Sequence, residues 1–146
     1  DFNVATGVVL SVPGTINHIC DDGFTKSGTG TMVLSGVNDY TAATQINGGI
    51  LALGSAGALG DVAPILFGGG TLQYGSANQT DYSDRFATSG GQAWSIDTNG
   101  QSVTFASDLQ GAGSSLSKSG TGTLTLTGDN THDGAISVQA GSLDLA

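Results

Sequence analysis

Three local pairs of aspartates are the groups in this sequence with the clearest potential for catalysis. Two carboxyl groups can hydrolyse a glycosidic bond when one has a raised pKa and its neighbour stays ionised. Eliminative cleavage of an acidic polysaccharide also needs a base and a cation, and Arg85 is the single arginine. Aspartates at turns accept hydrogen bonds from nearby backbone amides, so we interpret the pairs as turn residues and expect no catalytic site and no enzyme. The pairs are Asp21 with Asp22, Asp81 with Asp84, and Asp129 with Asp133.

Metal-binding patterns are incomplete. The segment 129–134 resembles the start of a calcium loop, but the position that needs a glutamate, eleven residues after Asp129, holds Ala140. His18 and Cys20 lie two residues apart, and two ligands do not make a zinc site. Cys20 is the only cysteine, which excludes an intrachain disulfide and favours a small buried side chain. We therefore predict no metal and no cofactor.

A repeat determines the elements that position these residues. Residues 24–54 and 116–146 align without a gap at an offset of 92 (118 − 26), and both contain Lys-Ser-Gly-Thr-Gly-Thr. The copies keep apolar residues at alternating positions and let the intervening positions vary, as in Val33 against Thr125. Alternation with period two indicates strands with one buried face. A repeat usually reflects stacked units that share a continuous core.

The spacing of the apolar pairs predicts the architecture. Most steps between pairs are 19, 21 or 22 residues (51 − 32, 72 − 51, 94 − 72), which matches one turn of a parallel β-solenoid. We interpret the single step of 9 (103 − 94) as two faces of one coil. The prediction is an all-β parallel β-solenoid of about seven coils, and a β-sandwich built from hairpins is the alternative. The pairs begin at Met32, Leu51, Leu72, Trp94, Val103, Leu124 and Leu143.

Composition and charge argue against several classes of function. The chain has 25 glycines, 10% charged residues, and an acidic side made of aspartate alone. Strong helix formers are scarce, so we expect no helix of any length. The net charge of −9 argues against nucleic acid, since phosphate neutralisation requires clustered Lys and Arg. The sequence shows no signal peptide and no apolar run long enough to cross a bilayer. If the protein is exported, we expect the sequence to be a mature form or an excised segment.

The second copy resembles a known repeat. Residues 118–128 read Lys-Ser-Gly-Thr-Gly-Thr-Leu-Thr-Leu-Thr-Gly, followed by Asp-Asn-Thr-His-Asp-Gly and Gly-Ser-Leu-Asp-Leu. This is similar to the autotransporter-associated β-strand repeat, and the similarity extends over residues 24–146. His132 departs from the aromatic usual at its position. The resemblance implies a right-handed parallel β-helix in a secreted or surface-displayed bacterial passenger; the family is defined by architecture and has no shared activity.

The two ends of the chain suggest self-association. We divide the chain into an N-terminal strand segment, 1–23, and a β-solenoid, 24–146. The β-prone segment 2–12 and the final strand around 143–145 would expose unpaired backbone groups, so we expect head-to-tail stacking, with the N-terminal strand adding to a neighbour's sheet. The residues predicted for the core and for assembly are Phe2, Val4, Val8, Leu10, Met32, Leu34, Leu51, Leu53, Leu124, Leu126, Leu143 and Leu145.

The function predicted from these features is a non-catalytic structural rod of an extracellular or cell-surface assembly, which stacks into a filament or stalk. One alternative is an adhesin segment that binds glycans or surfaces, which would present exposed aromatics such as Tyr40, Tyr74 and Tyr82. A polysaccharide lyase or hydrolase is the third alternative. Trp94 falls on the inward register, and we predict that it packs in the core.

Overall fold

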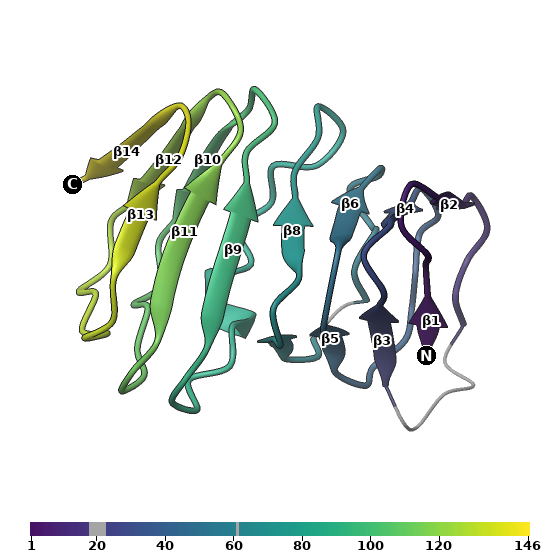
Figure 1. The fold of residues 1–146 in the computed structure, drawn as a ribbon, viewed down its shortest axis with the longest axis horizontal. Helices are drawn as coiled ribbons and strands as arrows, with labels where there is room; N and C mark the ends of the chain where they lie inside the picture. Colours follow the sequence, from purple (N-terminus) through teal and green to yellow (C-terminus); the bar gives the residue numbers. More distant parts are fainter. Residues whose placement is uncertain (18–22, 61) are drawn as a thin grey trace.

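The protein is a stack of seven coils whose chain runs along the long axis, so that the termini lie at opposite ends (Figure 1). This computed structural model describes residues 1–17, 23–60 and 62–146. The helical structure in the described residues is one short 3₁₀ turn, η1 (Ser83–Arg85). The strands are β1 (Phe2–Asn3), β2 (Val9–Val12), β3 (Phe24–Ser27), β4 (Thr31–Leu34), β5 (Thr44–Ile46), β6 (Ile50–Leu53), β7 (Ile65–Phe67), β8 (Thr71–Gln73), β9 (Ala93–Asp97), β10 (Ser102–Phe105), β11 (Ser115–Ser119), β12 (Thr123–Leu126), β13 (Ile136–Val138) and β14 (Ser142–Leu145).

Every pairing between strands is parallel, and successive coils supply the neighbours. The first sheet has the order β1-β3-β5-β7, the second β13-β11-β9-β8-β6-β4-β2, and the third β10-β12-β14. A sandwich of hairpins would require antiparallel ladders. The predicted parallel β-solenoid of about seven coils is confirmed.

The core is a continuous apolar column enclosed by the sheets. The strands alternate buried and half-buried residues, as in β4 and β12, because successive side chains point to opposite faces. Stacked inward residues include Met32 on Leu51, and Leu51 on Leu72. Trp94 is buried, as predicted from its inward register. The hydrophobic effect along this column is the main stabilising term of the stack.

The strand pair moves to a different pair of sheets between the fourth and fifth coils. In the first four coils, one strand lies in the first sheet and the next in the second. Ile96 of β9 then pairs with Leu72 of β8, a step of 24 residues (96 − 72), and the strand that follows, β10, opens the third sheet. The longer coil carries η1, and Phe86 continues the first sheet by an isolated bridge to Ile65. The first repeat copy therefore lies in the first and second sheets, and the second copy in the second and third.

The N-terminal segment forms the first coil of the same stack. β1 pairs with β3 and β2 with β4 in continuous register. Val4 is buried, and its backbone oxygen accepts a hydrogen bond from the Gly30 amide at 2.9 Å. One edge of each strand is thus paired with the second coil.

Glycines form the corners where strands of one coil meet. Gly49 and its repeat equivalent Gly141 (49 + 92) have φ of 61° and 69°, which favours glycine. A Cβ atom at either position would overlap a backbone oxygen of the preceding coil, that of Gly30 or of Gly122. These corners require glycine for both conformation and space.

No helix in the described residues has the length and apolar character to cross a bilayer.

Candidate functional site: corner lysines and coil ends

Both lysines lie inside the solenoid, and their ammonium groups share three equivalent backbone contacts. Lys26 follows the inward register of β3 and is fully buried. Its Nζ donates to the backbone oxygens of Ser27 at 2.7 Å, Gly28 at 2.9 Å and Gly48 at 3.0 Å. Because Gly48 belongs to the next coil, the ammonium joins two coils at one corner.

Lys118 repeats this arrangement in the second copy. Its Nζ donates to the backbone oxygens of Ser119 at 2.9 Å, Gly120 at 2.9 Å and Ala140 at 3.0 Å, each 92 positions beyond its counterpart. It also donates to Oγ1 of Thr98 at 2.8 Å, in the preceding coil. Lys118 therefore links three consecutive coils.

Burial lowers the pKa of both lysines, and for Lys118 the charge of Asp97 acts in the opposite direction. The hydrogen bonds with carbonyl oxygens stabilise each ammonium group, which forms no ion pair with a carboxylate of the described residues. These hydrogen bonds occupy the N–H donors of each ammonium group and leave none directed to a ligand. The lysines therefore hold adjacent coils together at the corners.

An asparagine in each copy, buried at Asn38 and half-buried at Asn130, fixes the irregular side of the coil. Oδ1 of Asn38 accepts a hydrogen bond from the amide of Ile16 at 2.7 Å, and Nδ2 donates to the oxygen of Ala58 in the following coil. Oδ1 of Asn130 accepts from the amide of Leu109 at 2.9 Å. In both copies, this asparagine therefore accepts a hydrogen bond from a backbone amide of the preceding coil.

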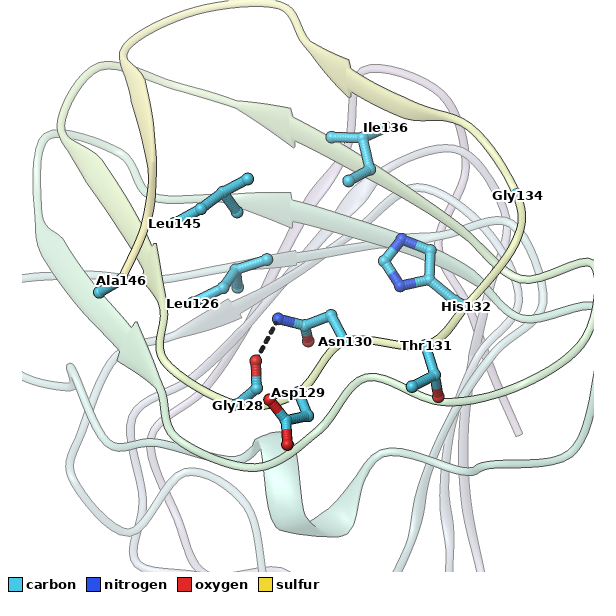
Figure 2. A pocket seen from close by; sticks show the side chains of 10 residues that line it. All are labelled: Leu126, Gly128, Asp129, Asn130, Thr131, His132, Gly134, Ile136, Leu145 and Ala146. Atoms are coloured by element: carbon cyan, nitrogen blue, oxygen red, sulfur yellow. Dashed lines mark hydrogen bonds between the residues drawn. The ribbon is translucent and has the colours of Figure 1, made fainter.

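The stack opens at its C-terminal end into a hollow of about 640 Å³ (Figure 2). The side chains of Leu126, His132, Ile136 and Leu145 point toward this space. His132 packs edge-on against Trp94, with ring centroids 5.4 Å apart and planes at 89°. Both ring nitrogens of His132 are buried and have no hydrogen-bond partner among the described residues.

The N-terminal end carries a stack of aromatic rings. Phe2 packs on Phe24 with centroids 5.3 Å apart, and Phe24 stacks on Tyr40 at 5.7 Å. Phe2 is the partly exposed member, and Val8 and Val9 are exposed beside it. Apolar surface is therefore present at both ends of the stack.

The residues predicted for core and assembly separate into two groups. Val4 and the six leucine and methionine positions of the central coils are buried, namely Met32, Leu34, Leu51, Leu53, Leu124 and Leu126. Leu10 and Leu143 are partly buried against this core. The exposed members lie in the two terminal coils, namely Phe2, Val8 and Leu145.

Two members of the predicted aspartate pairs, Asp81 and Asp133, accept hydrogen bonds from backbone amides. Asp81 accepts the amides of Ser83 and Ala106, both at 2.8 Å, and Asp133 accepts the amide of Gly113. Arg85 donates through Nε to the oxygen of Ala63 at 2.9 Å and lies over the ring of Tyr82. Asp81, Asp84 and Arg85 line one surface hollow of about 280 Å³, where Asp81 and Arg85 bind backbone groups.

The aromatic residues proposed for a glycan-binding row are in the interior. Tyr40, Tyr74 and Tyr82 are all buried, so these rings are unavailable for stacking on a sugar. The inward register of Tyr74, two residues after Leu72, was the sequence signal for this placement.

In residues 1–17, 23–60 and 62–146, no three His, Cys, Asp or Glu side chains are grouped to hold a metal ion. The predictions for His18, Cys20 and the pair Asp21 and Asp22 fall outside the described residues.

The two lysine-cornered repeats also match a known family. Residues 24–53 and 116–145 match the family model described as Passenger-associated-transport-repeat. Both copies therefore match this family of passenger repeats, which confirms the resemblance.

The chain is also similar to the Adhesin BmaC autotransporter of Brucella suis biovar 1 (strain 1330). The two are 36% identical over 147 residues, which cover 92% of this chain and 4% of that protein. The chain thus corresponds in length to a small part of this relative. No solved structure matches the chain significantly.

Proposed function

We propose that this chain is a non-catalytic shaft segment of a secreted or surface-displayed bacterial passenger, and that it stacks coil on coil through its open ends. The observation that carries the proposal is the apolar column, which runs through all seven coils and reaches solvent at Leu145 and Phe2. A shaft of this kind works by main-chain pairing and side-chain stacking alone. The passenger-repeat family and the autotransporter relative support the extracellular location.

Head-to-tail stacking would bring the edge strands β13 and β14 of one copy against β1 and β2 of the next. Such a contact does not close on itself and produces a filament. Exposed parallel edges provide the backbone hydrogen bonds, and the apolar residues at each end provide the buried surface.

Negative-stain electron microscopy of the purified chain, with and without residues 1–12, tests this assembly. We expect fibres from the full chain and their loss on truncation. The substitution Leu145→Asp should also abolish fibres, since it places a charge on the end surface. Thr125→Asp is the matched control, because Thr125 points outward from β12 and should leave fibres intact. Monodisperse particles from the full chain would contradict stacking between copies.

Adhesion through a lateral face is a second candidate, supported by the name of the relative. The outward side of the third sheet is a ladder of small polar residues that includes Thr104 on Thr125. Binding of the labelled chain to a printed glycan array, lost in Thr104→Ala/Thr125→Ala and kept in Leu145→Asp, would favour this function.

A further inference from the structure

Asn47 and Gly48 form the corner between β5 and β6, and this corner carries an acceptor of the Lys26 ammonium group. The backbone oxygen of Gly48 accepts the hydrogen bond from Nζ of Lys26 at 3.0 Å, and the Asn47 side chain is exposed. Asparagine is a chemically labile residue, and a glycine after it has no Cβ atom to shield its nitrogen from the asparagine side chain. The corner therefore combines a reactive dipeptide with a contact that holds two coils together.

The sequence contains a second Asn-Gly pair, Asn99 with Gly100, whose asparagine is also exposed. Hydrogen bonds hold the reacting groups of this pair. The Gly100 amide donates to the backbone oxygen of Thr121 at 2.6 Å, and Nδ2 of Asn99 donates to the backbone oxygen of Tyr74 at 3.2 Å. Attack by the Gly100 nitrogen on the Asn99 side chain requires these contacts to open first.

The first pair has no such restraint. The backbone amide of Asn47 donates to the oxygen of Lys26 at 2.8 Å, which fixes the residue in the stack. The Gly48 amide and the Asn47 side-chain amide have no hydrogen-bond partner among residues 1–17, 23–60 and 62–146. Both the nucleophilic nitrogen and the carbon that it would attack are therefore free to react.

We propose that Asn47 and Gly48 form a self-modifying site, at which the amide nitrogen of Gly48 attacks Cγ of Asn47 and closes a succinimide ring. A bond forms between that nitrogen and Cγ, the bond between Cγ and Nδ2 breaks, and Nδ2 leaves as ammonia with the proton that the Gly48 nitrogen loses. Water then hydrolyses the ring. Cleavage at Cγ gives an aspartate at position 47, and cleavage at the backbone carbonyl carbon of Asn47 gives an isoaspartyl link.

The isoaspartyl product would loosen the corner that Lys26 holds. It routes the main chain through Cβ and Cγ, so the connection between β5 and β6 becomes longer by an atom. This corner lies close to the next coil, since a Cβ atom at Gly70 would lie 2.9 Å from the Gly48 nitrogen. A longer connection therefore displaces the Gly48 oxygen from Nζ of Lys26. Both products also add a negative charge to a chain whose net charge is −9.

The second repeat copy has an unreactive version of the same corner. Gln139 and Ala140 occupy the equivalent positions (47 + 92 = 139, 48 + 92 = 140). The glutamine side chain is longer by a methylene and donates through Nε2 to Oγ of Ser117 at 3.1 Å, and the Ala140 methyl group shields its nitrogen. The oxygen of Ala140 still accepts from Nζ of Lys118 at 3.0 Å. The corner thus tolerates Gln-Ala, and the modifiable pair is confined to the first copy.

The test incubates the purified chain at mildly alkaline pH in water enriched in heavy oxygen, which marks each new carboxyl group. Trypsin then separates the two pairs into peptides 27–85 and 86–118 for mass spectrometry. We expect conversion at Asn47 to be roughly tenfold or more faster than at Asn99, because attack at Asn99 must first open its hydrogen bonds. In urea, where these contacts are lost, both pairs should convert at similar rates.

Two variants copy the second repeat and serve as matched controls. Asn47→Gln should abolish conversion at this corner, and Gly48→Ala should slow it strongly. After the incubation, the parent chain should unfold at a lower urea concentration than before, whereas Asn47→Gln should not change. Equal rates at the two pairs in the folded chain, or an unmodified Asn47 under conditions that convert the unfolded chain, would overturn the proposal. Unchanged conversion in Gly48→Ala would also overturn it, since attack by the Gly48 nitrogen would then be excluded.

Discussion

Lys26 and Lys118 make the same three backbone contacts but lie in different sheets of the solenoid. Lys26 pairs in register with Ile46 of the first sheet, whereas Lys118 pairs with Ile96 and Val138 of the second. The offset of 92 residues therefore corresponds to four full coils plus one further step from one sheet to the next. The repeat specifies a corner with its two flanking strands, and this corner can be built at different positions around the axis.

Replacing Lys118 by Met should destabilise the fold even though it removes a buried charge. Methionine fills a similar volume, but it removes the hydrogen bonds that Nζ donates to the oxygens of Gly120 and Ala140 and to Oγ1 of Thr98, and one of those that the Ser119 oxygen accepts. We expect a loss of about 1–3 kcal/mol in the free energy of unfolding, measured by urea titration. Ser117→Ala, at the neighbouring outward position, is the control and should change stability by less than about 0.5 kcal/mol. Equal losses of stability in Lys118→Met and Ser117→Ala would contradict the role of Lys118 in holding adjacent coils together.

The hydroxyl of Tyr74 is buried without a hydrogen-bond partner in the described residues. Tyr74→Phe should therefore stabilise the chain by about 0.5–1.5 kcal/mol. Tyr40→Phe is the matched comparison and should destabilise by a similar amount, because the Tyr40 hydroxyl bonds Thr44. In thermal denaturation at neutral pH, the midpoint should rise in Tyr74→Phe and fall in Tyr40→Phe. Two shifts of the same sign would refute this assignment.

Alkaline pH should unfold the chain through its tyrosines. Burial raises the pKa of Tyr74 well above its ordinary value of 10.0, and burial also raises the pKa of Tyr40. The unfolded chain then releases these protons before the folded chain does, so stability is fully present below pH 10 and falls as the pH rises above it. The decline in the free energy of unfolding above pH 10 should be smaller in Tyr74→Phe than in the parent chain. Identical slopes would exclude Tyr74 as a source.

The two repeat asparagines should differ in their contribution to stability. Asn38 bridges the preceding and following coils, whereas Asn130 contacts the preceding coil and its own loop. Asn38→Ala should cost roughly 1–3 kcal/mol, because a buried amide of Ile16 and a carbonyl of Ala58 lose their partner. Asn130→Ala should cost clearly less in the same urea titration. A larger loss of stability in Asn130→Ala than in Asn38→Ala would contradict this assignment of contacts.

Glycine corners should tolerate alanine according to the space around them. Gly49→Ala meets both a positive φ and the backbone oxygen of Gly30, and we expect it to prevent correct stacking of the third coil. Gly91 also has a positive φ, of 78°, but open space surrounds its Cβ position. Gly91→Ala should therefore cost only about 1–2 kcal/mol. Circular dichroism and thermal midpoints of the two variants provide the measurement.

The fold could be predicted because inward residues alternate with period two and recur at coil length. Met32, Leu51 and Leu72 pair in the register that their spacing predicts. The step of 9 residues was correctly interpreted as two faces of one coil, since β9 and β10 follow each other around a corner. The sequence did not reveal that this step also begins a new sheet. Leu72 pairs with Ile96 and not with Trp94, because the coil that carries η1 is longer than the others.

The site was harder to predict because its groups act on backbone atoms. The repeat places Lys26 and Lys118 at equivalent positions, but backbone oxygens have no side-chain signature in the sequence from which these partners could be predicted. The hollow beside His132 depends on how the last coil meets solvent. Its one signal in the sequence is the replacement of Tyr40 by His132 between the copies.

Because the second copy is shifted by one sheet around the solenoid axis, the outward surfaces of the two copies face in different directions. Val33 and Thr125 are repeat equivalents (33 + 92 = 125), yet they face outward from the second and the third sheet respectively. A partner that recognised the outward surface of the repeat would meet one copy on one side of the rod and the other copy around the corner. Adding repeats at this offset distributes contact points around the circumference as well as along the length.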